Sequence, residues 1–289
     1  MTAHEQAATD EAAAFPARIG LGTWAMGVAA AQRTREITAV RHALDAGYRV
    51  IDTAEMYADG GAERIVGSAL KAFGAARRAQ LYIVSKVMPG NASRGGTVRS
   101  CEASIERLGC EYLDLYLLHW PGQHPFSDTL QGFHELLRRG LIRRFGVSNL
   151  DIDGLRRWLQ VQDSLELPAS THCNQLYYCV EARGIEFDLL PFQRTRGIAT
   201  MAYSPLGRGS LAHDELLAQI GRERGASAAQ VALAWCLRQP DVIAIPKSVH
   251  AARIDENLTA AQIRLSASEL ARIDKAFPSP KSKRPLDMV

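Results

Sequence analysis

The sequence of 289 residues lacks several features that mark specialised classes of protein. It has no apolar run of membrane-spanning length, so we expect no transmembrane helix. Its five cysteines are odd in number and include no Cys-x-x-Cys pair, which suits a reducing cytosol. It also has no dense block of Lys and Arg, and its formal net charge of +3 is small. Nucleic-acid binding is therefore not expected.

The first 17 residues lack the marks of a secretory signal peptide. They are rich in Ala and acidic, with neither a basic stretch nor a long apolar one. We therefore expect a cytoplasmic protein with a poorly specified N-terminal arm over residues 1–17. Over the whole chain, 47% of residues are hydrophobic and 22% are charged, which is typical of a globular protein with a large core.

From residue 19 onward, short apolar segments alternate with segments that repeat apolar residues at helical spacing. The expected strands cover residues 19–23, 49–53, 81–86, 113–119, 144–149, 170–177, 198–204 and 242–247. The expected helices cover residues 34–46, 62–73, 97–108, 127–139, 152–162 and 228–238, with a broken helical stretch at 181–195 and a last helix from about 251. No linker rich in Pro, Gly or Ser divides them. We expect one domain over residues 18–277 and a short C-terminal tail over 278–289.

Eight strands that alternate with helices predict a parallel sheet, and eight such units close into a (β/α)8 TIM barrel of the α/β class. A doubly wound sheet is the alternative. It is disfavoured because no strand leads into a Gly-x-Gly-x-x-Gly turn; Gly20-Leu21-Gly22 lacks the third glycine. In a barrel, functional residues sit at the C-terminal ends of strands.

Three neighbouring expected strands end in ionisable residues, namely Asp52, Lys86 and His119, and Tyr57 follows five residues after Asp52. A tyrosine has an ordinary pKa of about 10, so it is a poor proton donor at neutral pH. An ammonium such as Lys86 would stabilise the phenolate and lower that pKa, while Asp52 would hold the ammonium charged. The group suits proton transfer to a carbonyl oxygen that gains negative charge, as it does on hydride delivery.

His119 would orient and polarise the substrate oxygen, either as a neutral N–H donor or in its charged form. Each of the four residues also has a structural interpretation. Asp52 could cap a turn, Lys86 could be a solvated strand end, Tyr57 could pack on the rim, and His119 could be a core histidine. Their joint placement after three neighbouring strands favours the functional interpretation.

These residues belong to a set of motifs that resembles the aldo-keto reductases. The motifs are 51–57 (IDTAEMY), 85–87 (SKV), 117–121 (LLHWP), 146–149 (GVSN), 174–175 (NQ), 202–206 (AYSPL) and 245–248 (IPKS), in the order of the family. The resemblance runs from about Ile19 to Asn257. Within the family it is greatest to bacterial methylglyoxal-type reductases, and it extends to the terminal residues 286–289.

The resemblance implies a (β/α)8 barrel that binds NADPH/NADP+ in extended form without a Rossmann motif. It implies that Tyr57 is the general acid, that Lys86 and Asp52 tune it, and that His119 orients the carbonyl. The other residues that it assigns to the cofactor are Gly22, Thr23, Trp24, Ser148, Asn149, Gln175, Tyr203, Ser204, Leu206, Gly207, Lys247, Ser248, Arg253, Glu256 and Asn257. Among these, Ser148, Asn149 and Gln175 would bind the carboxamide, and Tyr203 would stack on the nicotinamide.

The resemblance assigns Lys247, Ser248 and Arg253 to the adenosine 2'-phosphate of the cofactor, and this assignment also has a physical basis. Lys247 ends the eighth expected strand and Arg253 opens the following helix, so two cations and free backbone N–H groups converge where barrels often bind phosphate. The structural alternative is that Lys247 simply ends a strand and that Arg253 is a surface residue of the following helix. Two cations together favour NADPH over NADH.

Aromatic residues are expected to wall the substrate pocket. The pocket residues are Trp24, Met56, Tyr57, His119 and Trp120. The tail after residue 277 is too short for a long specificity loop, so we expect a permissive site for small aldehydes and dicarbonyls. Two departures from the family are the lack of a clear N-terminal hairpin pattern and Arg208, which stands where small residues are common.

The sequence therefore predicts an NADPH-dependent oxidoreductase of the alcohol:NADP+ type, which reduces aldehydes and small dicarbonyls such as methylglyoxal and serves in aldehyde detoxification. A nicotinamide-binding regulatory subunit on the same fold is the alternative. A barrel hydrolase would need paired acids or a cluster of metal ligands, and the rim shows neither, so no metal is expected. A small-molecule carbonyl is the expected partner of a monomer, with no nucleic acid or membrane.

Overall fold

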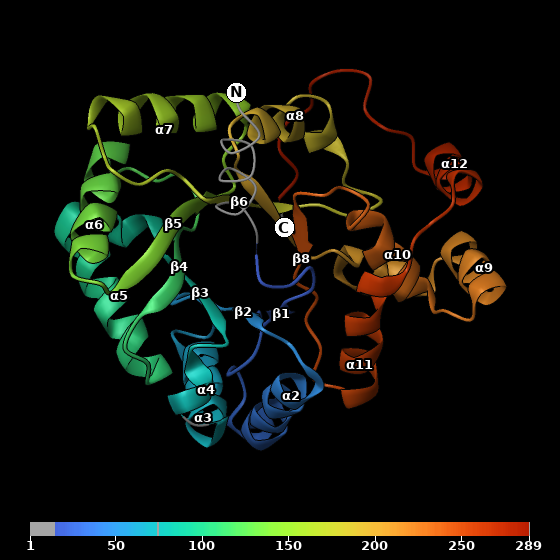
Figure 1. Ribbon diagram of the computed structural model, residues 1–289, viewed down its shortest axis with the longest axis horizontal. Coiled ribbons are helices and arrows are strands. Elements are labelled where there is room, and N and C mark those ends of the chain that lie inside the picture. Colours follow the sequence, from blue (N-terminus) through green and yellow to red (C-terminus); the bar gives the residue numbers. More distant parts are fainter. Residues whose placement is uncertain (1–14, 74, 289) are drawn as a thin grey trace.

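The computed structural model describes residues 15–73 and 75–288, and its eight strands form one parallel sheet in the order β1 to β8. Figure 1 shows the strands as an inner ring, with helices around it. The strands are β1 (Leu21–Gly22), β2 (Val50–Asp52), β3 (Tyr82–Val87), β4 (Leu113–Leu118), β5 (Ile142–Ser148), β6 (Cys173–Tyr177), β7 (Ala199–Tyr203) and β8 (Val242–Ala244). The predicted barrel is confirmed, and the doubly wound alternative is excluded because the strand order never reverses.

The barrel closes where residues 19–22, which include β1, pair with the end of β8 and the residues that follow it. Ile19 forms a parallel bridge with Ala244, Gly20 N donates to Ala244 O at 2.9 Å, and Gly22 N donates to Pro246 O at 3.1 Å. Because closure leaves no open strand edge, every strand has a neighbour on both sides.

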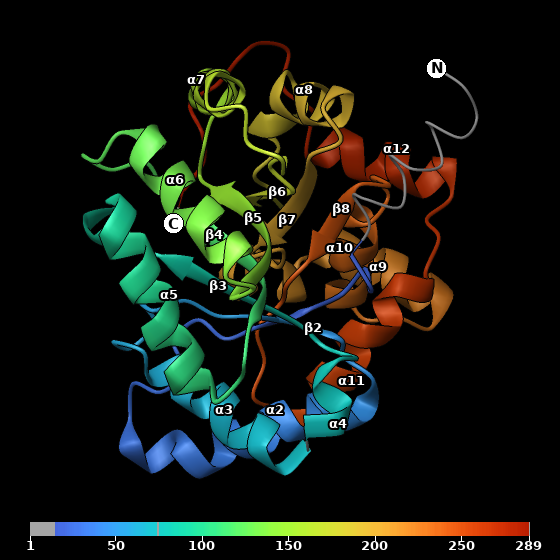
Figure 2. The ribbon, with the colours of Figure 1, turned by 60° about the vertical axis from the view of Figure 1, so that its left-hand side comes forward.

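Most strands are followed by a helix that packs on the outside of the ring, as Figure 2 shows from a second direction. The α-helices are α2 (Arg33–Ala46), α3 (Gly61–Phe73), α4 (Ala75–Arg78), α5 (Arg94–Leu108), α6 (Phe126–Arg138), α7 (Ile152–Ser164), α8 (Leu189–Thr195), α9 (Glu215–Arg224), α10 (Ala228–Cys236), α11 (Ala251–Thr259) and α12 (Ala267–Ala276). Short 3-10 turns are η1 (Ala30–Gln32), η2 (Pro89–Asn91), η3 (Gly184–Glu186), η4 (Gly207–His213) and η5 (Ala260–Gln262). In the described part of the chain, no helix is long and apolar enough to cross a membrane.

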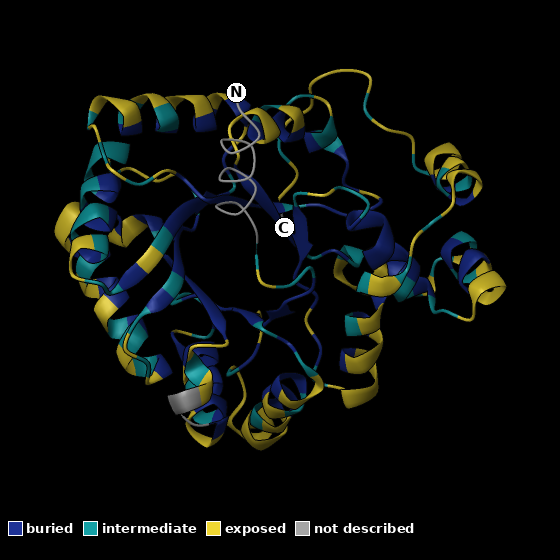
Figure 3. Cartoon of the chain, in the orientation of Figure 1, coloured by how far each residue is buried: buried dark blue, intermediate teal, exposed yellow. Residues whose placement is uncertain are grey.

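Two apolar clusters hold the barrel together, and Figure 3 shows the strands as almost entirely buried. The larger one lies between the strands and the helices. The smaller one fills the barrel interior and consists of Val50, Tyr82, Val84, Leu115, Leu117, Cys173, Met201, Ile243 and Ile245. An interior packed with branched side chains is a core and not a pore. It leaves the open ends of the barrel as the places for chemistry.

The predicted elements agree with the structure to within a few residues, apart from three helices, of which the first is the four-residue α4 that follows α3. Neither α9 nor α12 was expected, and both lie outside the ring of one helix per strand, with α9 packed on α10 and α12 packed on α9. The expected break in the stretch 181–195 separates η3 from α8. Most of the predicted N-terminal arm, residues 1–14, and the terminal Val289 lie outside the described residues. All five cysteines are free thiols.

Candidate active site

Three ionisable side chains from neighbouring strands meet at the C-terminal rim of the barrel. Asp52 ends β2, Lys86 is the fifth residue of β3, and His119 follows β4 directly. Asp52 is 2% exposed and Lys86 is completely buried. Lys86 Nζ lies 2.9 Å from the Asp52 carboxylate and also donates a hydrogen bond to Thr53 O at 2.7 Å. The predicted convergence of these residues is confirmed.

Tyr57 lies above this pair on the loop of residues 53–60 that connects β2 to α3; we call this segment the Tyr57 loop. The Tyr57 hydroxyl oxygen accepts a hydrogen bond from Lys86 Nζ at 3.3 Å. Its ring meets the His119 ring edge to face, with 5.8 Å between the centroids. Because the ammonium donates to the phenol oxygen, the phenol keeps its own proton for another acceptor.

The Tyr57 loop turns sharply through three successive residues in the left-handed region. Ala58 and Asp59 both have φ 51°, and Gly60 has φ 73°. Left-handed backbone is unfavourable for a residue with a side chain, so the surroundings must stabilise this conformation. Within the loop, Gly60 N donates to Glu55 O at 2.8 Å. The Glu55 carboxylate accepts from Met88 N at 2.7 Å, which ties the loop to the segment after β3.

Burial dominates the electrostatics of the rim. It raises the pKa of Tyr57 well above its ordinary value, and the negative charge of Asp52 raises it further. The prediction of a lowered Tyr57 pKa is therefore wrong for this structure, because desolvation of a phenolate outweighs the nearby ammonium. Burial also lowers the pKa of Lys86 and raises the pKa of Asp52, while the charge of each opposes the shift of the other. Tyr57 is thus a protonated phenol at neutral pH.

His119 is neutral at this site. Its side chain is 7% exposed, and burial followed by the charge of Lys86 lowers its pKa to about 2. The sequence allowed either a neutral or a charged imidazole, and the lowered pKa leaves only the neutral form. The Nδ1 atom is buried and has no hydrogen-bond partner among the described residues. A neutral ring beside Tyr57 can donate one N–H to a substrate oxygen, provided that Nε2 carries the proton.

The polar residues at the C-terminal ends of β5, β6 and β7 form a connected group next to Asp52. Ser148 Oγ donates to Gln175 O at 2.9 Å, and Asn149 Nδ2 donates to Ser148 Oγ at 3.1 Å. Tyr203 OH donates to Asn149 Oδ1 at 3.0 Å, and the Tyr203 ring stacks on Tyr177 at 5.8 Å. The structure therefore brings together the four residues that the sequence assigned to the nicotinamide end of the cofactor.

Gln175 makes a contact that the sequence did not predict. Its side-chain Nε2 donates to Asp52 Oδ1 at 2.7 Å and lies 2.8 Å from Met201 Sδ. The amide nitrogen is thus directed at the Asp52 carboxylate, and the amide oxygen remains as the acceptor. Asp52 and Gln175 are far apart in the sequence but lie on the same inner rim, so only the closed barrel reveals the contact.

Among the residues expected to wall the substrate pocket, the rings of Tyr57, His119 and Trp120 form a contiguous group. Trp24 follows β1 and is 56% exposed, while Met56 and Trp120 are partly buried. The Trp120 ring centroid lies 4.7 Å from that of His119. Thr23 Oγ1 donates to Asp52 O at 2.9 Å, which ties the loop that carries Trp24 to the end of β2.

The expected phosphate residues lie beyond β8. Lys247 and Arg253 are exposed, and within the described residues neither forms an ion pair. Ser248 Oγ accepts a hydrogen bond from His250 N at 3.1 Å, which shapes the turn before α11. Glu256 and Asn257 follow one turn later, with Asn257 buried.

The segment after β7 carries Ser204, Leu206 and Gly207. Ser204 has φ 47° and Gly207 has φ 56°, and the next residue, Arg208, is exposed and also left-handed with φ 57°. The side chain of Arg208, which departs from the family pattern, is therefore at the surface. The backbone of this segment turns twice within five residues.

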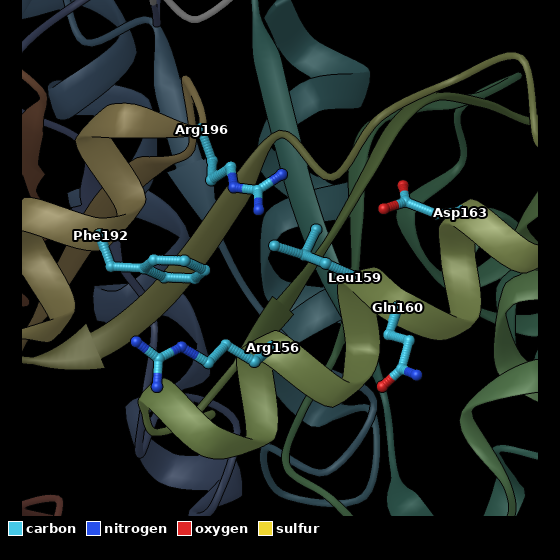
Figure 4. A pocket seen from close by; sticks show the side chains of 6 residues that line it. All are labelled: Arg156, Leu159, Gln160, Asp163, Phe192 and Arg196. Carbon is cyan, nitrogen blue, oxygen red and sulfur yellow. The ribbon is translucent and has the colours of Figure 1, made fainter.

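A surface hollow lies away from this rim, between α7 and α8. Figure 4 shows the side chains that line it, which are Arg156, Leu159, Gln160, Asp163, Phe192 and Arg196. None of the predicted site residues is among them. We place the candidate site at the barrel rim, because the buried charge pair, the phenol and the imidazole converge there.

The chain is similar to known proteins in both sequence and structure. The model of the aldo/keto reductase family matches residues 18–277. The chain is 44% identical over 278 residues to the methylglyoxal reductase YeaE of Escherichia coli, with 94% of each chain covered. It is 36% identical to the glyoxal reductase of Bacillus subtilis, with 86% of each covered. A crystal structure of an aldo-keto reductase from Klebsiella pneumoniae in complex with NADPH superposes with a TM-score of 0.88 at 42% identity, over 94% of this chain and 95% of that one.

Proposed function

Because the chain belongs to the aldo/keto reductase family, we propose that it reduces aldehydes and small dicarbonyls to alcohols with NADPH. The observation that carries the proposal is the Tyr57 hydroxyl held 3.3 Å from Lys86 Nζ, which is itself paired with Asp52 at 2.9 Å. This is a proton donor with a buried cation beside it, at the rim where barrel enzymes perform chemistry.

The residues of the rim divide the acid–base work. Bound NADPH would supply the hydride for the carbonyl carbon, so that negative charge would develop on the carbonyl oxygen. Tyr57 gives its proton to that oxygen and forms the alcohol, while Lys86 stabilises the phenolate that remains. Asp52 holds Lys86 in place, and neutral His119 orients the carbonyl by a hydrogen bond to its oxygen.

The residues present fit NADPH. Ser148, Asn149 and the Gln175 amide oxygen would bind the carboxamide, and the Tyr203 ring would stack on the nicotinamide. Lys247 and Arg253 would grip the 2'-phosphate. Two observations support this assignment. Both side chains are exposed and form no ion pair with the described residues, and both lie at or near the first turn of the nine-residue α11.

The remaining cofactor residues are assigned by their place along the barrel rim. Gly22, Thr23 and Trp24 would line the entrance after β1, Ser204, Leu206 and Gly207 would follow the pyrophosphate, and Ser248, Glu256 and Asn257 would contact the adenosine end. These assignments rest on their order around the rim and on the family.

Small dicarbonyls are the favoured substrates. Two relatives are named as methylglyoxal and glyoxal reductases. The rings of Tyr57, His119 and Trp120 form a contiguous aromatic surface at the rim. We further propose that the protein is a cytoplasmic monomer, as its free cysteines and the completeness of the rim within one chain suggest.

The test is loss of NADPH absorbance with methylglyoxal, phenylglyoxal, a nitrobenzaldehyde and an aldose, repeated with NADH. We expect turnover with NADPH, fastest with the dicarbonyls and much slower with NADH. Tight NADPH binding without turnover of any carbonyl would overturn the proposal and favour a regulatory subunit.

A further inference from the structure

A second buried carboxylate lies behind the active-site lysine. Glu63 is in the first turn of α3, six residues after Tyr57, and it is completely buried. Its Oε1 accepts a hydrogen bond from Ser85 Oγ at 2.6 Å, and its Oε2 accepts one from Arg107 Nε at 2.5 Å. Ser85 belongs to β3 and Arg107 to α5. One side chain therefore joins three elements around the Tyr57 loop.

The contact with Ser85 fixes the strand that carries Lys86. Successive residues of a strand point to opposite faces, so Lys86 points into the barrel and Ser85 points out toward α3. Glu63 thus binds the outer face of β3 directly behind the lysine. Since α3 begins at the end of the Tyr57 loop, the same side chain ties the loop and the lysine to each other.

Arg107 contacts the Tyr57 loop as well as the carboxylate. A Cβ added at Gly60 would lie 2.5 Å from Arg107 Cδ and 2.6 Å from its Nε, so the arginine packs against the bare backbone of this residue. Gly60 is the last of the three left-handed residues of the loop. A left-handed segment needs support from its surroundings, and Arg107, held by Glu63, provides it.

The charge of Glu63 also reaches Lys86. Burial lowers the Lys86 pKa, and the charges of Asp52 and then Glu63 raise it. The titratable groups around Lys86 are Asp52, Tyr57, Glu63, His119 and Cys173. Of the carboxylates in this set, Glu63 is the one that does not contact Lys86 directly.

We propose that Glu63 is a positioning residue for the proton transfer, which holds the Tyr57 loop and β3 in the register that sets the distance from the Tyr57 hydroxyl to Lys86 Nζ. The inference rests on the proposed function for its catalytic consequence, and on the contacts of Ser85, Arg107 and Gly60 for its structural basis. A buried ion pair is by itself weak evidence for stability. The geometric role of Glu63 follows from its hydrogen bonds, which join α3 to β3 and α5.

The test compares Glu63→Gln and Ser85→Ala with a matched control, Glu269→Gln. Glu269 is also a buried carboxylate bound by one arginine and one serine, Arg224 at 2.5 Å and Ser266 Oγ at 2.8 Å, but it lies in the outer helix α12. The control reproduces the loss of a buried charge without a change near Tyr57.

We expect Glu63→Gln to slow hydride transfer in a single turnover by about tenfold to a hundredfold, because a small misplacement of a catalytic group costs up to about that much. The NADPH dissociation constant should stay within about twofold, since no cofactor contact is removed. The alkaline limb of the rate profile should move to lower pH, because Lys86 loses a nearby negative charge. Ser85→Ala should slow transfer less and leave the limb in place, because the Glu63 charge remains.

A second readout needs neither cofactor nor turnover. The 13C resonance of the Tyr57 ring, assigned with Tyr57→Phe, should shift in Glu63→Gln and Ser85→Ala but not in Glu269→Gln. The proposal is wrong if both site variants keep the wild-type rate and the wild-type Tyr57 resonance. If Glu63→Gln does not fold, Ser85→Ala alone decides by the same two criteria. A wild-type protein that reduces no carbonyl refutes the proposed function, while the resonance still tests the positioning role.

Discussion

The protonated state of Tyr57 has a consequence for its role. Burial keeps its proton in place, so the phenol cannot lose it to water before the substrate oxygen becomes basic. Lys86 donates to the phenol oxygen, so in the proposed mechanism it would act mainly after proton transfer, when that oxygen carries a negative charge. The acidity needed at neutral pH then arises as charge develops on the substrate, and a permanently lowered pKa is not required.

Tyr57→Phe tests this assignment. The change removes the proton donor but keeps the ring that packs against His119. We expect carbonyl reduction to fall by about a hundredfold to ten-thousandfold, which is the usual contribution of a general acid, with NADPH affinity nearly unchanged. Steady-state rates and fluorescence titration of the cofactor measure the two quantities. A Tyr57→Phe protein that keeps the full rate would contradict the mechanism.

The pKa of His119 predicts a pH dependence of stability. It is about 2 in the folded protein and about 6.5 in the unfolded chain, so between these values the unfolded state binds one proton more. Stability therefore falls as the pH drops below about 6.5. At pH ~5 the wild type should have lost about 2 kcal/mol more than His119→Asn, relative to neutral pH. Urea unfolding of both proteins at the two pH values measures the difference; equal losses would show that the folded histidine titrates normally.

The sequence could predict which residues of the site stand at strand ends, because a charge that terminates an apolar strand is visible without a structure. It could not predict contacts made across the barrel. Gln175 reaches Asp52 from β6, and Glu63 reaches Ser85 from α3, and both depend on which face of a strand meets which neighbour. The raised pKa of Tyr57 was missed for the same reason, since burial is a property of the folded site.

At the scale of elements, the segment after β8 and the start of α11 form the proposed site for the 2'-phosphate. Lys247→Ala combined with Arg253→Ala should weaken NADPH binding by about a hundredfold or more, because hydrogen bonds to charged groups contribute about 1.5–3 kcal/mol each. NADH binding should change little, since it lacks the 2'-phosphate. The exposed Lys275 of α12 offers a control, and Lys275→Ala should leave both affinities unchanged. Equal losses for the two cofactors would exclude the phosphate site.

The prediction of one helix after each strand does not account for the helices α9 and α12. A chain interpreted as one helix per strand has no place for them, although their caps are visible in the sequence. Asp214 caps α9 by accepting from Leu217 N, and Ser266 with Glu269 forms a capping box at the start of α12. Local start signals of this kind identify a helix without reference to the repeat.

At the scale of the molecule, the two ends of the barrel have different tasks. The C-terminal rim carries the buried charges and the phenol, whereas side-chain contacts at the opposite end help to close the ring. Arg18 is the main example. Its guanidinium donates to the carbonyl oxygens of Val242, Leu237 and Gln239 at 2.9, 2.8 and 2.6 Å, and so joins the segment before β1 to the entrance of β8.

Arg18→Ala should separate stability from activity. Removal of three hydrogen bonds from a charged group should lower the free energy of unfolding by about 2 kcal/mol or more, because the three carbonyls lose their donor where the ring closes. The rate of carbonyl reduction at moderate temperature should be unchanged, since Lys247 and the rest of the rim lie at the other end of β8. Arg264, which donates to the local carbonyls of Ala261 and Ile263, provides the control, and Arg264→Ala should cost less than about 0.5 kcal/mol. Denaturant unfolding and steady-state kinetics measure the two effects. A loss of activity in folded Arg18→Ala would contradict this prediction. It would mean that the Arg18 contacts at the base of the barrel also determine the geometry of the active-site rim.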